Sequence, residues 1–559
     1  MVKSFLNVLN REISGLHQAA YLLGFFAICS QVIALFRDRI LAAQFGAGNT
    51  LDLYYSAFRI PDILFATVAS IVSISVLIPF LIERYEKSEE EAKEFIDTVF
   101  SFFFCLMAAS GILAYFAAPY IMAVLFPVFS HTSSFPELIG LTRILLLSPI
   151  FLGFSNLLAS ITQIHKRFFI YAVSPVVYNI GIIFGIVFLY PTFGLYGLGF
   201  GVALGAFFHF AIQIPFIVSQ RMLPKFRFPV KFSFIKKIVY TSFPRTITVS
   251  SNELAELFLV SFASFFAAGS ISVFNFSYNL QSVPFSIIGI SYSMAAFPTL
   301  TRLFSSGDHS EFLKHMIISA RHIIFWSVPV SVMFIVLRAQ IVRTILGSGR
   351  FNWDDTRLTA AALALFTASL LAQNLVSLFV RSYYSQGRTK TPLVMNVLSA
   401  LLIIGGSYYL VGVFQNNLFF RNFIESILKV SGIPGTSVLM LPLGFTIGVI
   451  VNLIIHWIGF NRHFPSFSRP VLRTFFEVFG ASIIMGFITY MCLSIFDRIF
   501  DINTLLGIFL QGLLSGIIGA VSGILILYLL KSKELSEVWS TLHKKIWSAR
   551  VIVPDAELQ

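Results

Sequence analysis

The sequence predicts an all-α polytopic membrane protein with about fourteen transmembrane helices. Hydrophobic residues make up 57% of the 559 residues and charged residues 12%. The mean hydropathy is +0.84, far above that of an ordinary soluble domain. Apolar runs long enough to cross a bilayer recur along the whole chain, separated by short polar loops. Together these observations predict two six-helix lobes followed by two further C-terminal helices.

The predicted domains follow the order of the spans. An N-terminal lobe (1–220) holds helices one to six, and a C-terminal lobe (238–461) holds helices seven to twelve. A basic cytoplasmic connector (221–237) separates the lobes, helices thirteen and fourteen lie within 462–531, and a cytoplasmic tail (532–559) follows. The expected spans are roughly 16–44, 50–83, 94–126, 136–164, 168–191, 194–220, 238–267, 270–304, 311–345, 354–386, 390–414, 436–461, 470–497 and 503–530.

Basic residues gather in alternate loops, which predicts the orientation. The loops on one side, together with both termini, hold most Lys and Arg. The opposite loops hold Arg350, Arg421, Lys429 and Arg498. The positive-inside rule therefore places both termini on the cytoplasmic side of the membrane. Because the net charge of +13 comes from such loops, it indicates contact with membrane lipids and no nucleic-acid partner.

The sequence shows few signs of other chemistry. The three cysteines lie within apolar segments, so no disulfide framework is expected. The N-terminus lacks the short apolar core and cleavage site of a signal peptide, so the first helix is expected to be retained. We find no phosphate-binding glycine loop, no metal-ligand spacing and no nucleophile elbow. These features predict a protein without cofactor or metal that is not an enzyme.

The chain also repeats itself weakly. The turn Phe45-Gly-Ala-Gly48 recurs as Phe266-Ala-Ala-Gly269, and Pro175 to Asn179 recurs as Pro392 to Asn396. His209 and His456 follow matching Gly-Val pairs, with an offset lengthened by an outer loop around 415–434. The shared order predicts a parallel repeat, and duplicated transporters of this kind bind substrate between their halves and work by alternating access.

Charged residues within the first two spans are the strongest functional signal. The triplet Arg37-Asp38-Arg39 interrupts an apolar segment, and the next span carries Asp52, Arg59 and Asp62. Charges at membrane depth face a protein interior or a watery cavity. The spacings of seven and three predict one helix face for the second group. One interpretation is a structural ion-pair cluster, and the other is a cavity that handles a charged substrate.

A second group of charges lies in the seventh span. Arg245 precedes Glu253 and Glu256, which are three residues apart and should share a helix face. Arginines of such a cavity can bind a pyrophosphate through bidentate hydrogen bonds. We expect Arg37, Asp38, Asp52, Arg59 and Arg245 to bind substrate. Glu253 and Glu256 are expected either to couple transport to a proton or cation, or to neutralise Arg37 and Arg245.

These residues carry a family resemblance. The segment FRDRILAAQFGAG (36–48), Asp52 and AFRIPD (57–62), together with Thr391-Pro392 after Gly387, resembles the MurJ/MviN lipid II flippases. Those flippases belong to the multidrug/oligosaccharidyl-lipid/polysaccharide exporter superfamily. The resemblance covers the whole chain and implies that Arg37, Asp38, Asp52 and Arg59 match family site residues. It further implies movement of undecaprenyl-pyrophosphate-linked peptidoglycan precursor to the outer leaflet, with the lipid tail held near 470–530.

The sequence departs from the family pattern at several expected site positions. Gln31 and Phe65 replace arginines, Asn279 and Ser282 replace a cavity arginine and a nearby glutamate, and Arg388 replaces an acidic residue of a sodium site. The resemblance therefore indicates a divergent, monomeric flippase of lipid-linked oligosaccharide, with cell-wall synthesis enzymes as possible partners. The alternatives are a polysaccharide-lipid or drug exporter, a transport-dead cell-wall scaffold, and a polyprenyl-linked glycosyltransferase or ligase, which would need a larger outer domain.

Overall fold

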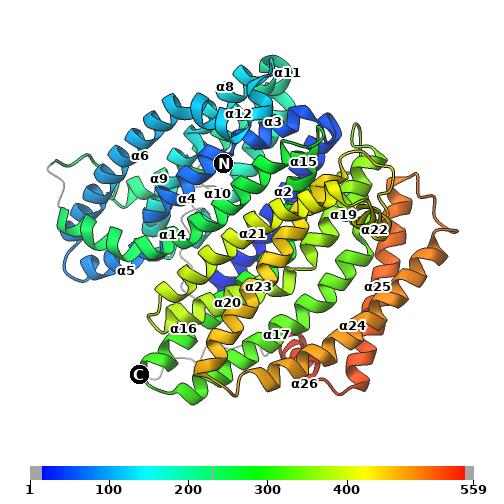
Figure 1. Ribbon diagram of the computed structural model, residues 1–559. Helices are drawn as coiled ribbons and strands as arrows, with labels where there is room; N and C mark the ends of the chain where they lie inside the picture. Colours follow the sequence, from blue (N-terminus) through cyan, green and yellow to red (C-terminus); the bar gives the residue numbers. More distant parts are fainter. Residues whose placement is uncertain (1–15, 73, 229–231, 548–559) are drawn as a thin grey trace. The chain divides into compact units, whose positions relative to one another are not determined.

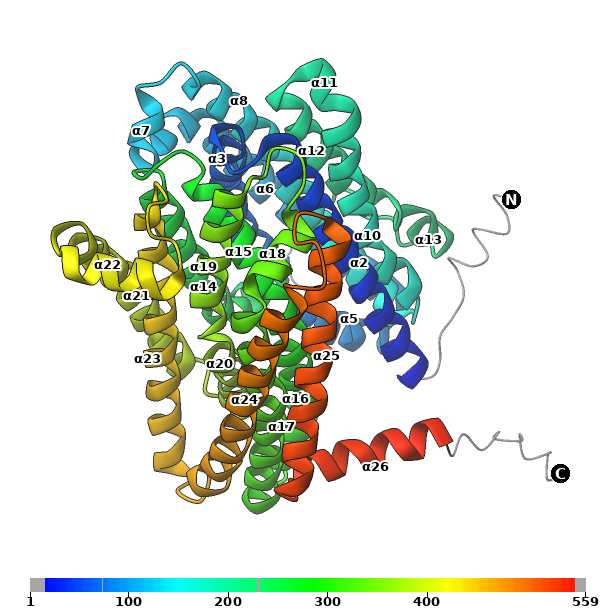
Figure 2. The ribbon, with the colours of Figure 1, turned by 90° about the vertical axis from the view of Figure 1, so that its right-hand side faces the viewer.

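The computed structural model describes residues 16–547 except 73 and 229–231, and the regular structure of this part of the chain is entirely helical. Figures 1 and 2 show long helices joined by short turns. Each predicted span coincides with one helix or with a helix broken into consecutive pieces. The predicted fold class is therefore confirmed.

The first six spans contain several breaks. They are α2 (Leu16–Phe45); α3 (Asn49–Ala57), α4 (Arg59–Thr67), η1 (Ala69–Val72) and α5 (Ile74–Tyr85); α6 (Glu89–Leu125) followed by the short α7 (Pro127–Ser130); α8 (Phe135–Leu145) and α9 (Leu147–Ile164); α10 (Phe168–Phe184), η2 (Gly185–Leu189) and α11 (Tyr190–Phe193); and α12 (Leu195–Ala211) with α13 (Ile214–Ser219).

The later spans follow the same pattern. They are α14 (Phe232–Ala263); α15 (Ser270–Pro284), η3 (Phe285–Ile290) and α16 (Ser291–Ser305); α17 (His309–Val336) and α18 (Arg338–Leu346); α19 (Trp353–Thr367) and α20 (Leu370–Ser385); α21 (Lys390–Asn416); η4 (Thr436–Leu439) and α23 (Met440–His463); α24 (Ser468–Phe496); and α25 (Leu505–Leu529). Two further helices, α22 (Leu418–Leu428) and α26 (Lys533–Trp547), lie outside the predicted spans.

Length and apolarity support this assignment. Among the described residues, 10 helices or helix runs are long and apolar enough to cross a membrane. The number is up to 11 if α19 and α20, which are bent by 41° relative to each other, form one span. The remaining predicted spans correspond to α2, to the broken run from α3 to α5, and to α14.

The chain packs as two compact units, each assembled from separate segments. The first comprises Met1–Val283, Ile345–Phe366 and Arg388–Asn452, and the second comprises Pro284–Thr344, Thr367–Gly387 and Leu453–Gln559. The predicted lobe boundaries at 221–237 stay a prediction.

Glycines allow a close helix contact in the first unit, between α12 and the run formed by α10 and η2. A Cβ on Gly201 would lie 2.4 Å from the Cα of Gly185, and a Cβ on Gly181 would lie 2.3 Å from the Cα of Gly205. No larger side chain fits such a contact without movement of backbone. Glycines at these positions therefore allow the two helices to approach closely.

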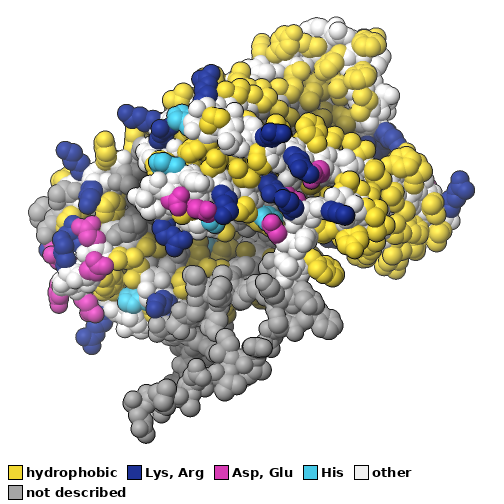
Figure 3. All heavy atoms as spheres, turned by 90° about the horizontal axis from the view of Figure 1, so that it is seen from below, with side chains coloured by type: hydrophobic (Ala, Val, Ile, Leu, Met, Phe, Trp, Pro, Cys, Tyr) yellow, Lys and Arg dark blue, Asp and Glu magenta, His cyan; other side chains and the backbone are white. Residues whose placement is uncertain are grey.

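Apolar side chains cover much of the described surface. Phe116, Val124, Phe476 and Val521 are all exposed, and Figure 3 shows broad areas of hydrophobic side chains beside groups of charged ones. A surface of this kind is stable against lipid tails and would be unfavourable in water.

Candidate functional site

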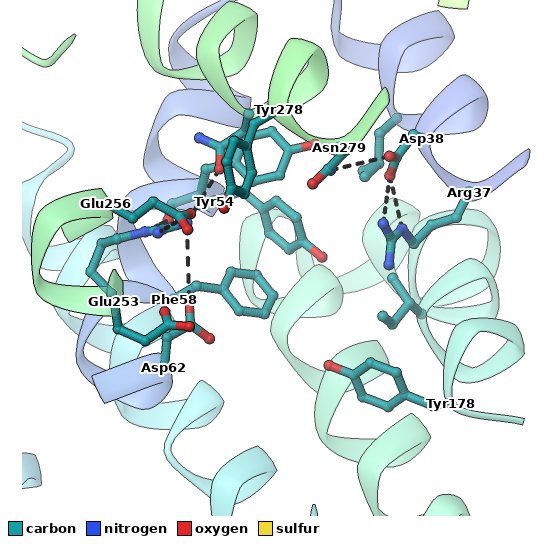
Figure 4. Close-up of a pocket in the computed structure, with 15 residues that line it drawn as sticks. Arg37, Asp38, Tyr54, Phe58, Asp62, Tyr178, Glu253, Glu256, Tyr278 and Asn279 are labelled. Carbon is teal, nitrogen blue, oxygen red and sulfur yellow. Dashed lines mark hydrogen bonds and ion pairs between the residues drawn. The ribbon is translucent and has the colours of Figure 1, made fainter. Parts of the chain in front are cut away.

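The first unit contains a charged cavity of about 290 Å³. Its walls come from α2, α3, α4, α10, α14 and α15. Figure 4 shows Arg37 and Asp38 on one side of the cavity and Asp62, Glu253 and Glu256 on the other. Tyr and Asn side chains complete the lining: Tyr54, Tyr55, Tyr178, Asn275, Tyr278 and Asn279. The cavity thus has an Arg37 end and an Arg59 end.

At the Arg37 end, the guanidinium is held by a carboxylate and an amide. Arg37 Nε and Nη2 donate to Asp38 Oδ1 at 2.9 and 2.7 Å, and Nη1 donates to Asn179 Oδ1 at 3.0 Å. Asn279 Nδ2 donates to the second oxygen of Asp38 at 3.2 Å. Because Asp38 is buried, this pairing keeps its charge compensated in the absence of substrate.

At the Arg59 end, one guanidinium meets several acceptors. Arg59 Nη1 lies 2.7 Å from Glu256 Oε1, Nη2 donates to Asn275 Oδ1 at 3.2 Å, and Nε donates to the Tyr55 carbonyl at 3.3 Å. Asp62, three residues along α4, lies 3.9 Å from the same guanidinium. Arg59 is buried, so these acceptors replace the water that the charge would otherwise bind.

Carboxylates outnumber guanidinium groups around this cavity. Two arginines, Arg37 and Arg59, face four carboxyl groups, those of Asp38, Asp62, Glu253 and Glu256. No cation among the described side chains lies within ion-pair distance of Glu253. Carboxylates this close in a largely dry site resist simultaneous ionisation. The described lining is therefore suited to take up a proton or a cation.

Asp52, a residue of α3, lies apart from this cavity and contacts the start of α15. Its carboxylate accepts hydrogen bonds from the backbone N–H groups of Gly269 and Ser272, at 2.6 and 2.8 Å, and from the Ser272 hydroxyl at 2.6 Å. These bonds satisfy N–H groups that have no partner within the first turn of the helix. The predicted common helix face therefore holds for Arg59 and Asp62 but is wrong for Asp52, since the helix is interrupted at Phe58.

Three glycine turns of the first unit meet beside Asp52, and we call this arrangement the clasp: residues 43–52, 266–272 and 345–355. Gly46, Gly269 and Gly349 all have positive φ angles. Cβ atoms on Gly269 and Gly349 would each lie 2.2 Å from a carbonyl oxygen, that of Ala47 and of Ala43 respectively. The Arg350 N–H donates to the Ala43 carbonyl at 2.9 Å, so the turns are joined by backbone bonds as well as by Asp52. The recurring turns 45–48 and 266–269 thus contact each other.

The structure brings together most of the residues that the sequence singled out. Arg37, Asp38, Arg59, Glu253 and Glu256 line one cavity. Asp52 belongs to the clasp, and the side chain of Arg245, in α14, lies outside the described residues. The roles predicted for all seven residues stay predictions.

The sequence interpretation missed the uncharged part of the lining. Tyr54, Tyr55, Tyr178 and Asn275 were not singled out, and Asn279 was noted as a departure from a family arginine. A signal was present, because Asn275, Tyr278 and Asn279 follow i, i+3, i+4 spacing on α15. Polar groups that share a face of an apolar helix point to a cavity or to a partner helix.

A polytopic helical protein whose buried charges surround a cavity belongs to the class of membrane transporters. The chain is a member of the lipid II flippase family MurJ, whose family model matches residues 41–511. This family comprises transporters, and the apolar helices agree with a multi-pass protein of the bacterial inner membrane.

Relatives and solved structures agree with this assignment. The chain is 26% identical to "Probable lipid II flippase MurJ" of Thermotoga maritima, over 93% of this chain and 97% of that one. It is 23% identical to "Lipid II flippase MurJ" of Burkholderia cenocepacia, over 84% and 89%. The fold is similar to "Lipid II flippase MurJ, inward closed conformation", with a TM-score of 0.72, 23% identity and coverage of 91% and 99%.

More distant similarity extends to drug transporters. An inward-facing multidrug resistance MATE family transporter of the MOP superfamily has a TM-score of 0.62 at 15% identity, over 78% of this chain and 96% of that one. This similarity concerns the fold alone.

Proposed function

We propose that this protein moves lipid II, an undecaprenyl-pyrophosphate-linked peptidoglycan precursor, from the inner to the outer leaflet of the bacterial plasma membrane. Membership of the lipid II flippase family is the observation that carries the proposal. The chain would act as a monomer through alternating access, without catalysing a reaction, and with both termini in the cytoplasm.

The headgroup would bind by exchange of anions at the two arginines. Arg37 and Arg59 are each held by a carboxylate before substrate arrives, at 2.7 Å in both cases. A pyrophosphate offers more oxygen acceptors than a carboxylate and matches the planar guanidinium fork. The incoming anion would displace Asp38 from Arg37 or Glu256 from Arg59, while Asn279 and Asn275 remain as neutral hydrogen-bonding groups. Arg245 is a further candidate for this role.

The carboxylates that the headgroup displaces from the arginines would couple transport to a proton or cation. Once a pyrophosphate occupies the arginines, Glu256 and Asp62 lose their compensating charge, and both lie in the same cavity as Glu253. A proton or a monovalent cation bound there would restore the balance, and its release would favour the return of the empty transporter. We infer that Glu253 and Glu256 form the coupling site. The competing interpretation, in which Glu256 serves only as a structural partner of Arg59, makes a different prediction.

Two experiments separate these claims. Expression of the chain in cells depleted of their own lipid II flippase should restore growth, whereas failure with normal membrane insertion would favour the scaffold alternative. Transport by the Glu253→Gln, Glu256→Gln double variant should then be measured in vesicles with imposed proton or sodium gradients. Loss of the response to a gradient supports coupling at this pair. A response like that of the wild type places coupling elsewhere.

The exporter alternative rests on the fold shared with MATE transporters. It predicts that drug or polysaccharide-lipid efflux, and not lipid II translocation, depends on Arg37 and Arg59. Comparing both activities in the same Arg37→Ala vesicles discriminates between the two functions.

A further inference from the structure

The outer loop after α21 contains a further α-helix, α22. It begins at Leu418, is capped by the Asn417 side chain, which accepts a hydrogen bond from the Phe420 N–H at 3.0 Å, and ends at Leu428. Figure 2 shows α22 lying across the end of α21 instead of continuing it. A helix that turns aside at the end of a membrane span needs a partner for whichever of its faces is apolar.

The apolar face of α22 is wider than its contact with the rest of the first unit. Residues four apart advance by about 40° around a helix, so Phe419, Phe423 and Ile427 form one stripe and Phe420, Ile424 and Leu428 form the next. The second stripe is half-buried against the protein. The first stripe is exposed, by 81%, 52% and 58% respectively.

The opposite face fixes how the helix is held. Glu425 is buried and accepts hydrogen bonds from Arg421 Nε at 2.9 Å and from the Thr436 hydroxyl at 2.7 Å. Arg421 and Asn422 remain exposed beside it, whereas Ser426, seven residues after Phe419, lies next to the exposed stripe. The helix is therefore pinned through its polar side, and the exposed stripe of Phe419, Phe423 and Ile427 is held on a fixed side of the unit.

The length of α21 places α22 at a definite depth. With 27 residues, α21 is about 40 Å long, which matches a bilayer including its headgroup layers. Exposed Leu401, Tyr408 and Tyr409 continue along α21 toward the same end. Exposed apolar side chains are thus found both on α21, which is long and apolar enough to span a membrane, and on α22 at its C-terminal end. Tyrosines are typical of the headgroup level of a bilayer.

We propose that α22 is an interfacial helix, with Phe419, Phe423 and Ile427 inserted among the acyl chains of the leaflet at the C-terminal end of α21. By the charge bias of the loops this is the outer leaflet. Arg421 and Lys429, at the polar edge, carry charge suited to lipid phosphates. Lipid is the favoured occupant because α22 directly follows α21, a helix long and apolar enough to span a membrane, whose own exposed side chains are largely apolar. This inference goes beyond the transport function and does not depend on it.

Spin labels at neighbouring positions test this orientation. The full-length chain, with its three cysteines replaced by serine, would carry a nitroxide at Phe423→Cys or, as the matched control, at Asn422→Cys. Each variant is placed in nanodiscs of phosphatidylcholine and phosphatidylglycerol. Collisions with oxygen, which dissolves in acyl chains, are compared with collisions with a water-soluble nickel chelate. Ile427→Cys, compared with the same Asn422→Cys control, is a second variant of the stripe should Phe423→Cys fold poorly.

The expected result is a higher ratio of oxygen to nickel collisions at 423 and 427 than at 422. Equal, water-like ratios at all three positions would overturn the proposal, because the apolar stripe would then face solvent. Protection of 423 and 427 from both reagents would also overturn it, since it indicates burial against protein, such as a second copy of the chain.

Discussion

At the scale of single residues, the arginines of the cavity are compensated before any substrate binds. Arg37 is paired with a carboxylate that is itself buried. Removing one member of such a pair leaves an uncompensated charge in a poorly solvated place. Substitutions at the cavity therefore change folding as well as binding, and each experiment needs a variant that separates the two effects.

Arg37→Ala should reduce lipid II translocation while leaving the protein inserted in the membrane. Loss of a charge-assisted hydrogen bond to a pyrophosphate costs on the order of 1.5–3 kcal/mol, or about tenfold or more in affinity. The double variant Arg37→Ala, Asp38→Ala removes the orphaned carboxylate and should regain thermal stability without regaining transport. Normal flipping in vesicles by the Arg37→Ala, Arg59→Ala variant would contradict the proposed pyrophosphate contact.

Asp52 should affect the clasp and not headgroup affinity. Asp52→Asn keeps the shape of the side chain but replaces one acceptor oxygen by a donor, which cannot accept the N–H of Gly269 or Ser272. We expect greater labelling from outside of a cysteine placed at Ser270, a buried residue of the clasp, because in this variant the clasp opens more often. The apparent affinity for lipid II should change less than in Arg37→Ala. A larger loss of affinity than in Arg37→Ala would indicate that Asp52 contributes to the substrate site.

At the scale of helices, the importance of the glycine contact between η2 and α12 can be tested by comparing alanine substitutions at Gly201 and at a glycine with free space around it. Gly201→Ala would place a Cβ 2.4 Å from the Cα of Gly185, so the helices must separate. Overpacking of this kind costs about 1–3 kcal/mol. Gly405→Ala, on α21, meets nothing within 4 Å and should be neutral or stabilising by up to about 1 kcal/mol. Thermal unfolding of both variants in the same lipid measures the difference.

The docking of α26 depends on a single buried carboxylate in the second unit. Glu534 lies 2.6 Å from Arg321 and accepts hydrogen bonds from Thr474 at 2.9 Å and Ser532 at 2.9 Å. Burial of the Glu534 carboxyl raises its pKa, but hydrogen bonds from its own backbone, Ser532 and Thr474, together with Arg321, outweigh burial and lower the pKa. The stabilisation is therefore present above the ordinary pKa near 4.5 and is lost as the pH falls through the lowered value.

Glu534→Gln should consequently speed tryptic cleavage after Lys544 at neutral pH. Acidification should then change the stability of the α26 contact in this variant less than in the wild type. The matched control is Glu537→Gln, because Glu537 is 55% exposed and contacts His322 at 3.0 Å. The control should cleave at nearly the wild-type rate. Equal cleavage rates for Glu534→Gln and wild type would show that other contacts hold α26.

At the scale of the whole molecule, the orientation in the membrane follows from charge and can be measured directly. Single cysteines at Ser88, Gly387 and Lys533 should be protected from an impermeant reagent added outside the cell, whereas cysteines at Asn49 and Asn417 should react. These positions are chosen from both sets of loops in the sequence. Labelling at Gly387 from outside would overturn the predicted orientation.

The fold was more predictable from the sequence than the site. Hydropathy located the spans because lipid forces every backbone polar group into a helix, and the three-residue spacing placed Asp62 beside Arg59. No local pattern indicates that Arg59 meets Glu256, 197 residues away, or that Arg37 meets Asn179. Asp52 shows the same limit, because a buried carboxylate that caps a helix cannot be told from a binding residue by its sequence.

The hydrogen bonds of the clasp also determine how much free energy its opening would require. Its turns lie beside exposed residues such as Asn49, Ala268 and Arg350, so water can hydrate each donor and acceptor when the turns separate. A hydrogen bond exchanged for water changes the free energy by about 0.5–1.5 kcal/mol, and opening the clasp would therefore require a few kcal/mol in total. Population shifts of that size lie within reach of ligand binding. Hydration of the turns thus keeps the free energy of opening the clasp small, although the turns close tightly in the absence of substrate.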